Sequence, residues 1–192
     1  MIRQATISDA SRIAEIDVAA ERFAYKDFLP EEALYKALLV EDRISRVKKW
    51  INEKSFEIFV FEDDTTGTVK AMMGFGQCGD ADKKNAFELH FLYVEPCFSH
   101  GGIGSKMISF FEQEGKKKGY AEFVIWVLQD NRIGINCYQK NGYSCDGSTK
   151  LFQRFNKNEA RFDDELYFRD YLTQYPVIAK EYEELKLRLW KE

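Results

Sequence analysis

The chain has 192 residues, with 32 acidic against 28 basic side chains and a formal net charge of −4. This length fits one domain, and the 45 % of hydrophobic residues can fill its core. The acidic excess argues against a nucleic-acid-binding protein, which usually carries a surplus of basic residues. The four cysteines lack the CxxC spacing of a zinc site and are too few for a disulfide framework, so we expect no metal.

The N-terminal sequence MIRQATISDA contains no apolar stretch of the kind that forms a signal peptide. The longest apolar run, Phe123–Leu128, is also too short to span a bilayer. We therefore expect a cytoplasmic protein with no membrane partner.

The N-terminal quarter of the chain predicts a strand followed by helices. Residues Ile2–Ala5 have the pattern of a short strand, and Thr6 with Asp9 three positions later has the spacing of a capping box. Apolar residues then recur at helical spacing. Pro30 is expected to open a second helical stretch, which the apolar rhythm extends to Asn52.

Three strand patterns follow. Phe56–Phe61 and Val69–Gly76 predict strands on either side of the turn Asp63–Gly67. Phe87–Val94 predicts a third strand, which Pro96 ends.

The next segment predicts a helix, a strand and a second helix. Residues Gly101–Gly104 open the first helix, and the basic residues Lys116–Lys118 followed by Gly119 are typical of its end. Phe123–Leu128 is apolar throughout, as expected of a strand buried on both faces. Ile133–Lys140 predicts a short helix.

The C-terminal part is less diagnostic. Tyr143–Phe155 and Glu165–Leu172 resemble two late strands, and Ala179–Trp190 resembles a charged helix. No break in composition requires a second domain. We expect one domain over residues 1–175 and a helical extension over residues 176–192, packed on that domain or on a partner.

A glycine-containing turn between a strand and a helix is the most informative feature. The N-terminus of a helix presents unpaired N–H groups and a partial positive charge. Glycines such as Gly101, Gly102 and Gly104 allow a bulky anion to approach that backbone, so the turn predicts a phosphate or diphosphate site. The alternative is an ordinary tight turn, and the spacing excludes a P-loop and GxGxxG.

Here the sequence resembles a known family. The stretch LYVEPCFSHGGIGSKM is similar to the strand, loop and helix of GNAT acetyltransferases, whose signature is Arg/Gln-x-x-Gly-x-Gly/Ala. The terminal Gly-x-Gly falls on Gly102 and Gly104. Ser99 stands at the Arg/Gln position, which departs from the family pattern.

A second stretch, NRIGINCYQKNGY, resembles the family pattern Asn-x-x-Ala-x-x-Phe-Tyr-x-x-x-Gly-Phe. Asn131, Tyr138 and Gly142 are in register, whereas Gly134 replaces Ala and Cys137 replaces Phe. Two motifs in the correct order carry more weight than either alone.

The resemblance implies the GNAT fold, an α/β domain with a mixed, mostly antiparallel sheet that is flanked by helices and splayed between its fourth and fifth strands. It implies that acetyl-CoA is the acetyl donor, with the diphosphate held by the amides of the turn and the pantetheine arm held along the preceding strand. The cofactor-binding residues that it implies are Leu92, Tyr93, Val94, His100, Gly101, Gly102, Ile103, Gly104, Ser105, Asn131 and Tyr138.

The same resemblance assigns catalytic roles. Tyr138 is expected to protonate the departing thiolate, and Asn131 to bond the pantetheine arm or its neighbouring backbone. The alternatives are that Tyr138 is a core aromatic and that Asn131 is a helix N-cap.

The general base is expected on the strand before the turn. Strand alternation predicts that Glu88, His90, Leu92 and Val94 share one face. A carboxylate made more basic by burial, or an imidazole, could accept the proton directly or through water. Both Glu88 and His90 stay open as the base at this point.

The implied function is an N-acetyltransferase that transfers acetyl by direct attack to a primary amine of a small molecule or a peptide N-terminus. Tyr25 and Phe28 lie where the first helices of the family border the acceptor cleft, so they are candidate substrate contacts. The oligomer is expected to be a monomer or a homodimer. Two alternatives stay open, a non-catalytic acyl-CoA sensor, which Ser99 motivates, and an unrelated nucleotide-binding domain.

Overall fold

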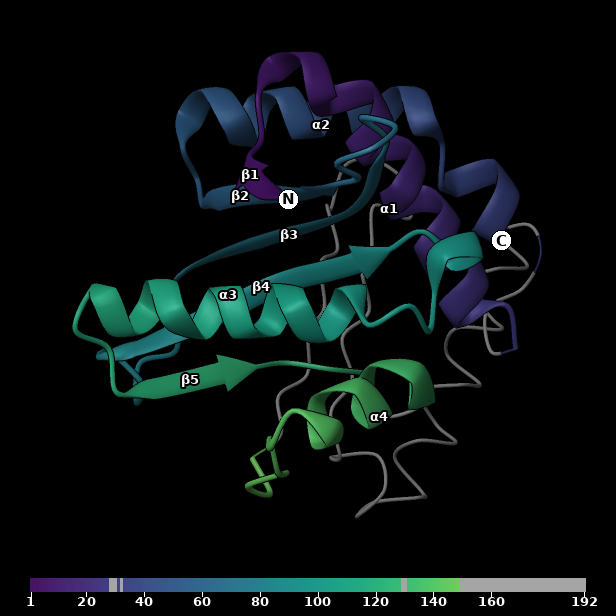
Figure 1. Cartoon of the computed structure of the whole chain (residues 1–192). Coiled ribbons are helices and arrows are strands. Elements are labelled where there is room, and N and C mark those ends of the chain that lie inside the picture. The colour runs from purple at the N-terminus through teal and green to yellow at the C-terminus, as the bar shows by residue number, and fades with distance from the viewer. Residues whose placement is uncertain (28–30, 32, 129–130, 149–192) are drawn as a thin grey trace. The chain divides into compact units, whose positions relative to one another are not determined.

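The computed structural model describes residues 1–27, 31, 33–128 and 131–148 (Figure 1). The chain divides into two compact units, Met1–Ile125 and Trp126–Glu192. Several predictions lie outside the described residues: the strand at 165–172, the helix at 179–190 and the domain boundary after residue 175. Of the predicted strand at 143–155, only residues 143–148 are described, and they form no strand.

The first unit is built on a five-stranded mixed sheet in the order β1-β2-β3-β4-β5. The strands from β1 to β4 are antiparallel to their neighbours, whereas β4 and β5 run parallel. This mixed, mostly antiparallel sheet confirms the predicted fold class. The strand bounds are β1 (Ile2–Gln4), β2 (Glu57–Glu62), β3 (Val69–Gln77), β4 (Ala86–Val94) and β5 (Glu122–Ile125).

The prediction for β5 was wrong in length and in burial. The apolar run predicted a strand to Leu128 buried on both faces, but β5 ends at Ile125, and Phe123–Ile125 are only half-buried. The strand ends there because its pairing with β4 stops at Leu89.

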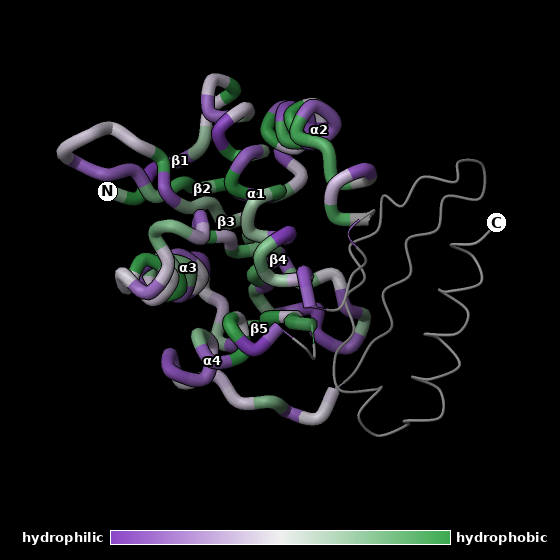
Figure 2. Tube along the Cα trace, turned by 90° about the vertical axis from the view of Figure 1, so that its right-hand side faces the viewer, coloured by the Kyte–Doolittle hydropathy of each residue, from purple (hydrophilic) through white to green (hydrophobic). Residues whose placement is uncertain are grey.

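Helices cover both faces of the sheet in the first unit. The helices α1 (Ala10–Tyr25) and α2 (Val40–Glu53) pack on each other, and α1 contacts β3 and β4. The helix α3 (Ile103–Lys117) contacts the same two strands from the opposite face (Figure 1). Along α3, hydrophilic and hydrophobic residues alternate, as expected of a helix with one face against a sheet (Figure 2).

The 3₁₀ turn that leads into α1 has the predicted capping box. A short 3₁₀ turn, η1 (Ile7–Asp9), precedes the helix. The Asp9 carboxylate accepts a hydrogen bond from the Thr6 amide at 2.8 Å, and the Asp9 amide donates to the Thr6 carbonyl at 3.0 Å. Arg3 of β1 donates two further hydrogen bonds to the same carboxylate. The sequence pattern therefore located this helix start correctly.

The predicted second helical stretch is interrupted. It consists of a π-helical turn, η2 (Ala33–Ala37), and of α2, with two non-helical residues between them. The side chain of Arg22 in α1 donates to the carbonyls of Leu34 at 2.8 Å and Leu38 at 2.7 Å. Because a tertiary contact takes these carbonyls, the helical hydrogen-bond ladder does not run through this segment.

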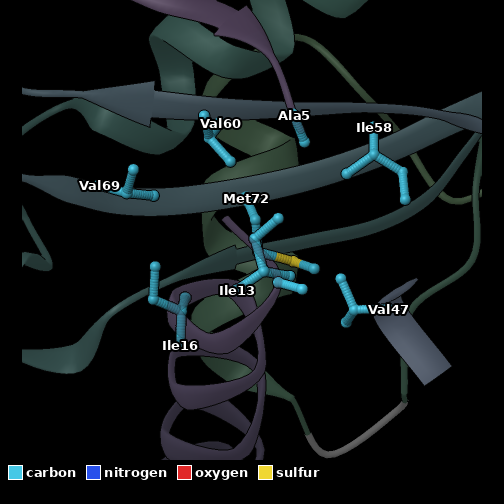
Figure 3. Packing of buried hydrophobic residues seen from close by; sticks show 9 residues of the cluster. Ala5, Ile13, Ile16, Val47, Ile58, Val60, Val69 and Met72 are labelled. Carbon is cyan, nitrogen blue, oxygen red and sulfur yellow. The ribbon is translucent and has the colours of Figure 1, made fainter. Parts of the chain in front are cut away.

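Two hydrophobic layers hold the helices to the sheet. On the face of α1 and α2, the buried cluster drawn in Figure 3 comprises Ala5, Ala10, Ile13, Ile16, Val47, Ile58, Val60, Val69 and Met72. On the face of α3, the layer is aromatic, and Phe87 stacks on Phe111 with ring centroids 5.3 Å apart. Phe75 contacts both of these rings.

Short turns join β4 to α3 and end α3. The 3₁₀ turn η3 (Pro96–Phe98) follows β4, as expected from Pro96. Gly119, in the left-handed region with φ 88°, ends α3 as predicted. In the second unit, α4 (Arg132–Lys140) confirms the predicted short helix. No helix within the described residues combines the length and hydrophobicity needed to cross a membrane.

Candidate active site

The strands β4 and β5 part half-way along β4 (Figure 1). Their parallel register runs from Ala86 opposite Glu122 to Leu89 opposite Ile125. On its other edge, β4 stays paired with β3 as far as Val94. In the described part of the chain, no strand pairs with residues 90–94 along the β5 edge. The sheet is therefore splayed as predicted, and the polar backbone groups on this edge lie outside the sheet ladder.

A β-bulge lies at the point where the strands part. The register between β3 and β4 shifts by one residue between Gly74 and Phe75, and His90 is the β4 residue without a counterpart. The consecutive side chains of His90 and Phe91 both contact Phe56, at ring-centroid distances of 5.0 and 5.6 Å. The bulge thus places two neighbouring residues on the same face.

The bulge corrects the predicted alternation along β4. We expected every second residue over Glu88–Val94 to share one face, and this is wrong beyond His90. Phe91 stacks on Trp50 of α2 at 5.4 Å, so it faces α1 and α2. Leu92 consequently turns toward the face that α3 covers.

Glu88 and His90 form a pair on the face of α1 and α2. The His90 Nδ1 atom lies 3.4 Å from Glu88 Oε1, and the Gly79 amide donates to Glu88 Oε2 at 3.3 Å. Burial raises the pKa of the neighbouring Cys78 to about 11, so its thiol stays protonated and donates to the same carboxylate. Glu88 is nearly buried, whereas His90 is partly exposed.

The pKa of Glu88 shifts against our expectation. Burial pushes this pKa upward, but the hydrogen bonds from His90, the Gly79 amide and Cys78 outweigh it and leave the pKa below its usual value. Glu88 is therefore a fixed negative charge beside the imidazole rather than a carboxylate made more basic. Nδ1 is the ring nitrogen that faces Glu88, so the tautomer with its hydrogen on Nδ1 leaves Nε2 as a proton acceptor.

Two glycines of β3 leave room for these side chains. A Cβ atom built on Gly76 would lie 3.4 Å from His90 Nε2. A Cβ atom built on Gly74 would lie 2.2 Å from the ring of Phe91. The space above Gly74 is thus filled by an aromatic ring, whereas Gly76 carries no side chain beside Nε2.

The turn before α3 has the geometry of an anion site. His100 and Gly102 both adopt the left-handed region, with φ 64° and 75°. The Lys106 amide donates to the Gly102 carbonyl at 3.1 Å, and this is the first hydrogen bond of the α3 helix. The amides that come before Lys106 therefore belong to the N-terminal turn, where helical amides have no carbonyl partner four residues earlier within the helix. Residues 100–102 are exposed, and a Cβ atom built on Gly102 meets no described atom within 4 Å. The turn therefore fits a diphosphate such as that of coenzyme A.

Side chains from the first unit hold the approach to this turn. Arg12 of α1 forms an ion pair with Glu95 and also donates to the Val69 carbonyl at 3.0 Å. The ammonium of Lys70 lies 4.7 Å from the ring centroid of Phe98. These contacts fix the segment that leads from β4 into α3.

Two of the predicted site residues belong to the second unit. Asn131 is the N-cap of α4, and its Oδ1 accepts from the Gly134 amide at 2.9 Å, which confirms the N-cap interpretation. Burial raises the pKa of Tyr138, and the neighbouring Cys137 raises it further, so the phenol stays protonated. Their roles toward coenzyme A stay predictions.

The candidate substrate contacts are only partly described. Tyr25 is buried at the end of α1. Phe28 lies outside the described residues. Among the described residues, no three His, Cys, Asp or Glu side chains gather to hold a metal ion.

Sequence reasoning missed a buried charged cluster. Arg43 of α2 lies 3.2 Å from Asp17 and 2.8 Å from Glu21, both in α1. The hydroxyl of Tyr93 in β4 donates to the second oxygen of Glu21 at 3.2 Å. The signal in the sequence was the spacing of the two acids, four residues apart on the helix face that also carries Ile13.

A splayed sheet followed by an exposed glycine turn and a helix is the arrangement that the resemblance to GNAT acetyltransferases implied. The sequence matches the model of the Acetyltransferase (GNAT) family over residues 19–143, and the chain belongs to this family. It is therefore an acetyl-CoA-dependent N-acetyltransferase.

Individual relatives agree with this family. The chain is 27 % identical over 164 residues to a spermidine N(1)-acetyltransferase of Thermoplasma acidophilum, and the match covers 80 % of this chain and 95 % of that protein. The fold is similar to that of the PaiA N-acetyltransferase of the same organism in complex with coenzyme A. The TM-score is 0.59 at 21 % identity, covering 88 % of this chain and 94 % of that one. A ribosomal-protein-alanine N-acetyltransferase from Brucella melitensis has a TM-score of 0.58 at 21 % identity, with 81 % and 91 % covered.

Proposed function

We propose that the chain acetylates a primary amine of a small molecule or a peptide N-terminus by direct attack, with His90 as the general base. The observation that carries this proposal is the Glu88–His90 pair, because it lies at the point where β4 parts from β5. An imidazole beside a carboxylate is a residue type that serves as a general base.

In the proposed reaction, His90, Glu88 and Tyr138 each have a separate role in proton transfer. Acetyl-CoA supplies a thioester carbon, to which the amine nitrogen bonds as the carbon–sulfur bond breaks. His90 Nε2 accepts the proton that the amine loses, and the charge of Glu88 stabilises the imidazolium. The Tyr138 hydroxyl gives its proton to the departing thiolate, and solvent returns a proton from His90 to Tyr138. Because burial raises the pKa of Tyr138, this hydroxyl carries the proton that the thiolate needs.

Binding of the donor is assigned to two backbone features. The amides of residues 100–105 would hold the diphosphate, and the free edge of β4 at Leu92–Val94 would accept the pantetheine arm. The exposed turn, with its two left-handed residues, supports the first assignment. The absence of a described strand along the β5 edge of residues 90–94 supports the second.

The acceptor is best sought among small cationic amines first. The relative from Thermoplasma acidophilum that matches most of this chain is a spermidine N(1)-acetyltransferase. The ionised Glu88 beside the proposed base would favour an acceptor that carries positive charge. Spermidine, monoamines and a peptide with a free N-terminus therefore form the panel to test.

Release of free thiol from acetyl-CoA in the presence of each amine tests the proposal. We expect thiol release that depends on the acceptor. His90→Gln should lower kcat by about 100-fold, the typical contribution of a general base. Tyr138→Phe should lower kcat while the calorimetric Kd for coenzyme A changes little. The matched control is Tyr120→Phe, since Tyr120 stacks on Phe87 on the face of the sheet that α3 covers.

The assay also separates the alternatives. A protein that binds coenzyme A but releases no thiol with any amine would be a sensor, the reading that Ser99 motivates. Full activity in His90→Gln would contradict the assignment of the base, and Glu88→Gln would then be the next variant to measure.

A further inference from the structure

The buried charged cluster between α1 and α2 lowers the free energy of unfolding through the desolvation of its three ions. Asp17 and Glu21 are each 1 % exposed and Arg43 is 5 % exposed. Removing charges from water costs several kcal/mol per ion, and well-packed hydrophobic residues often give equal or greater stability. Stability alone therefore does not explain why two acids and one arginine occupy this core.

The cluster links α2 to β4 through the carboxylate of Glu21. Arg43 Nη2 holds Glu21 Oε2 at 2.8 Å, and Arg43 Nη1 lies 3.2 Å from Asp17 Oδ2. The other oxygen of Glu21, Oε1, accepts the hydroxyl of Tyr93 at 3.2 Å. The carboxylate of Glu21 is thus fixed on one side by α2 and bonds β4 on the other.

Tyr93 lies in the part of β4 that has lost its β5 neighbour. Its backbone is opposite Met72 of β3, so β3 holds one edge of the strand. Its ring lies beside that of Phe91, with centroids 6.3 Å apart and planes nearly parallel. The bond from Tyr93 to Glu21 is therefore a tie that links α1 to the half of β4 that pairs with β3 but no longer with β5, three residues beyond His90.

We propose that Glu21, held by Arg43, which also pairs with Asp17, is a positioning residue that acts through Tyr93. The tie keeps residues 90–94 of β4 in the conformation that binds the pantetheine arm and keeps His90 in place at the bulge. This inference rests on the proposed function of the same site, because it assumes that this edge of β4 binds the donor.

Tyr93→Phe tests the tie, because it removes one hydroxyl and leaves the ring. We expect about a tenfold weaker calorimetric affinity for coenzyme A and about a tenfold lower kcat/KM, as for the loss of a hydrogen bond to a charged group. Amide hydrogen exchange at residues 90–94 should become about tenfold faster. Tyr120→Phe, which removes the same hydroxyl from a residue on the other face, should change none of the three.

Glu21→Gln is a second variant that tests the hydrogen bond between Glu21 and Tyr93. It should produce a loss of similar size, and the double variant with Tyr93→Phe should lose little more than either single variant, because both changes break the same link. If Glu21→Gln fails to fold, Tyr93→Phe still decides the question.

The outcomes distinguish this inference from the proposed function. Wild-type affinity, kcat/KM and exchange in Tyr93→Phe, beside an active wild-type enzyme, would overturn the inference alone. A purely structural role would lower the melting temperature of Tyr93→Phe without changing affinity or exchange well below it, and this would also overturn the inference. A wild-type protein that acetylates no amine would instead contradict the proposed function.

Discussion

At the scale of single residues, the site depends on which atoms surround His90 Nε2. The bulge places the imidazole over Gly76, so Nε2 lies beside a residue that carries no side chain. The next glycine along the same face, Gly74, is covered by the ring of Phe91. The two glycines are two residues apart on β3, yet Gly74 makes room for the ring of Phe91 and Gly76 lies beside His90 Nε2.

Alanine at these two positions should separate catalysis from stability. Gly76→Ala should keep or slightly raise stability, since alanine restricts the unfolded chain, but should lower kcat by about tenfold because its methyl group would lie in van der Waals contact with Nε2. Gly74→Ala should lower the free energy of unfolding by about 1–3 kcal/mol, because its methyl group collides with Phe91. Denaturant unfolding and steady-state kinetics of both variants give the comparison. A fully active Gly76→Ala would contradict an approach of the acceptor to Nε2 over Gly76.

At the scale of elements, the junction of β1 and α1 is held by Asp9. Hydrogen bonds from Arg3 are the largest cause that lowers the pKa of Asp9 to about 2, and the bonds from Thr6 add to the effect. Arg3 also contacts Glu62 of β2, so one cluster joins the helix start to two strands. The sequence predicted the helix start but gave no sign of the arginine.

This junction predicts how stability depends on pH. Because the pKa of Asp9 is lower in the folded than in the unfolded chain, its contribution is complete above about pH 4 and is lost as the pH falls through about 2. Asp9→Asn should therefore lower the free energy of unfolding by about 2 kcal/mol at pH 7, and the difference should shrink below pH 4. Urea unfolding at several pH values measures it.

The exposed Asp64 provides the control for this experiment. Asp64→Asn should change the free energy of unfolding by less than about 0.5 kcal/mol, as is usual for exposed pairs. A difference between wild type and Asp9→Asn that stays constant from pH 7 to pH 3 would contradict the role of the ionised carboxylate.

At the scale of the whole molecule, binding of the donor should be linked to folding. A ligand that binds only the folded chain stabilises it by about 2.7 kcal/mol at a concentration of 100 times its Kd. For a chain of this length we expect coenzyme A to raise the melting temperature by about 5–10 °C. Differential scanning calorimetry with coenzyme A and, separately, with ATP makes the measurement.

The turn before α3 provides the matched variant. Gly102 has φ 75°, a conformation that a β-branched residue strongly disfavours, so Gly102→Val should reorient the amides and reduce the shift caused by coenzyme A. A rise in melting temperature with ATP but not with coenzyme A would favour the alternative of an unrelated nucleotide-binding domain and would conflict with the donor site.

Local signals predicted most of the elements. Period-two and helical patterns located β1 to β4, α3 and α4 closely, because binary patterning records which face of an element is buried. They failed where a tertiary contact overrode the local pattern. Arg22 interrupts the second helical stretch by bonding its carbonyl groups, and β5 stops early because its pairing with β4 ends at Leu89.

The sequence by itself determined the family, the order of the elements and the position of the glycine turn, because these depend on residues close together in the chain. Only the tertiary structure revealed the bulge at His90, the lowered pKa of Glu88 and the link from Arg43 through Glu21 to Tyr93. A bulge is a mismatch in register between two strands, and a pKa depends on burial and on partners from distant segments. Neither is encoded in the periodicity of any single segment.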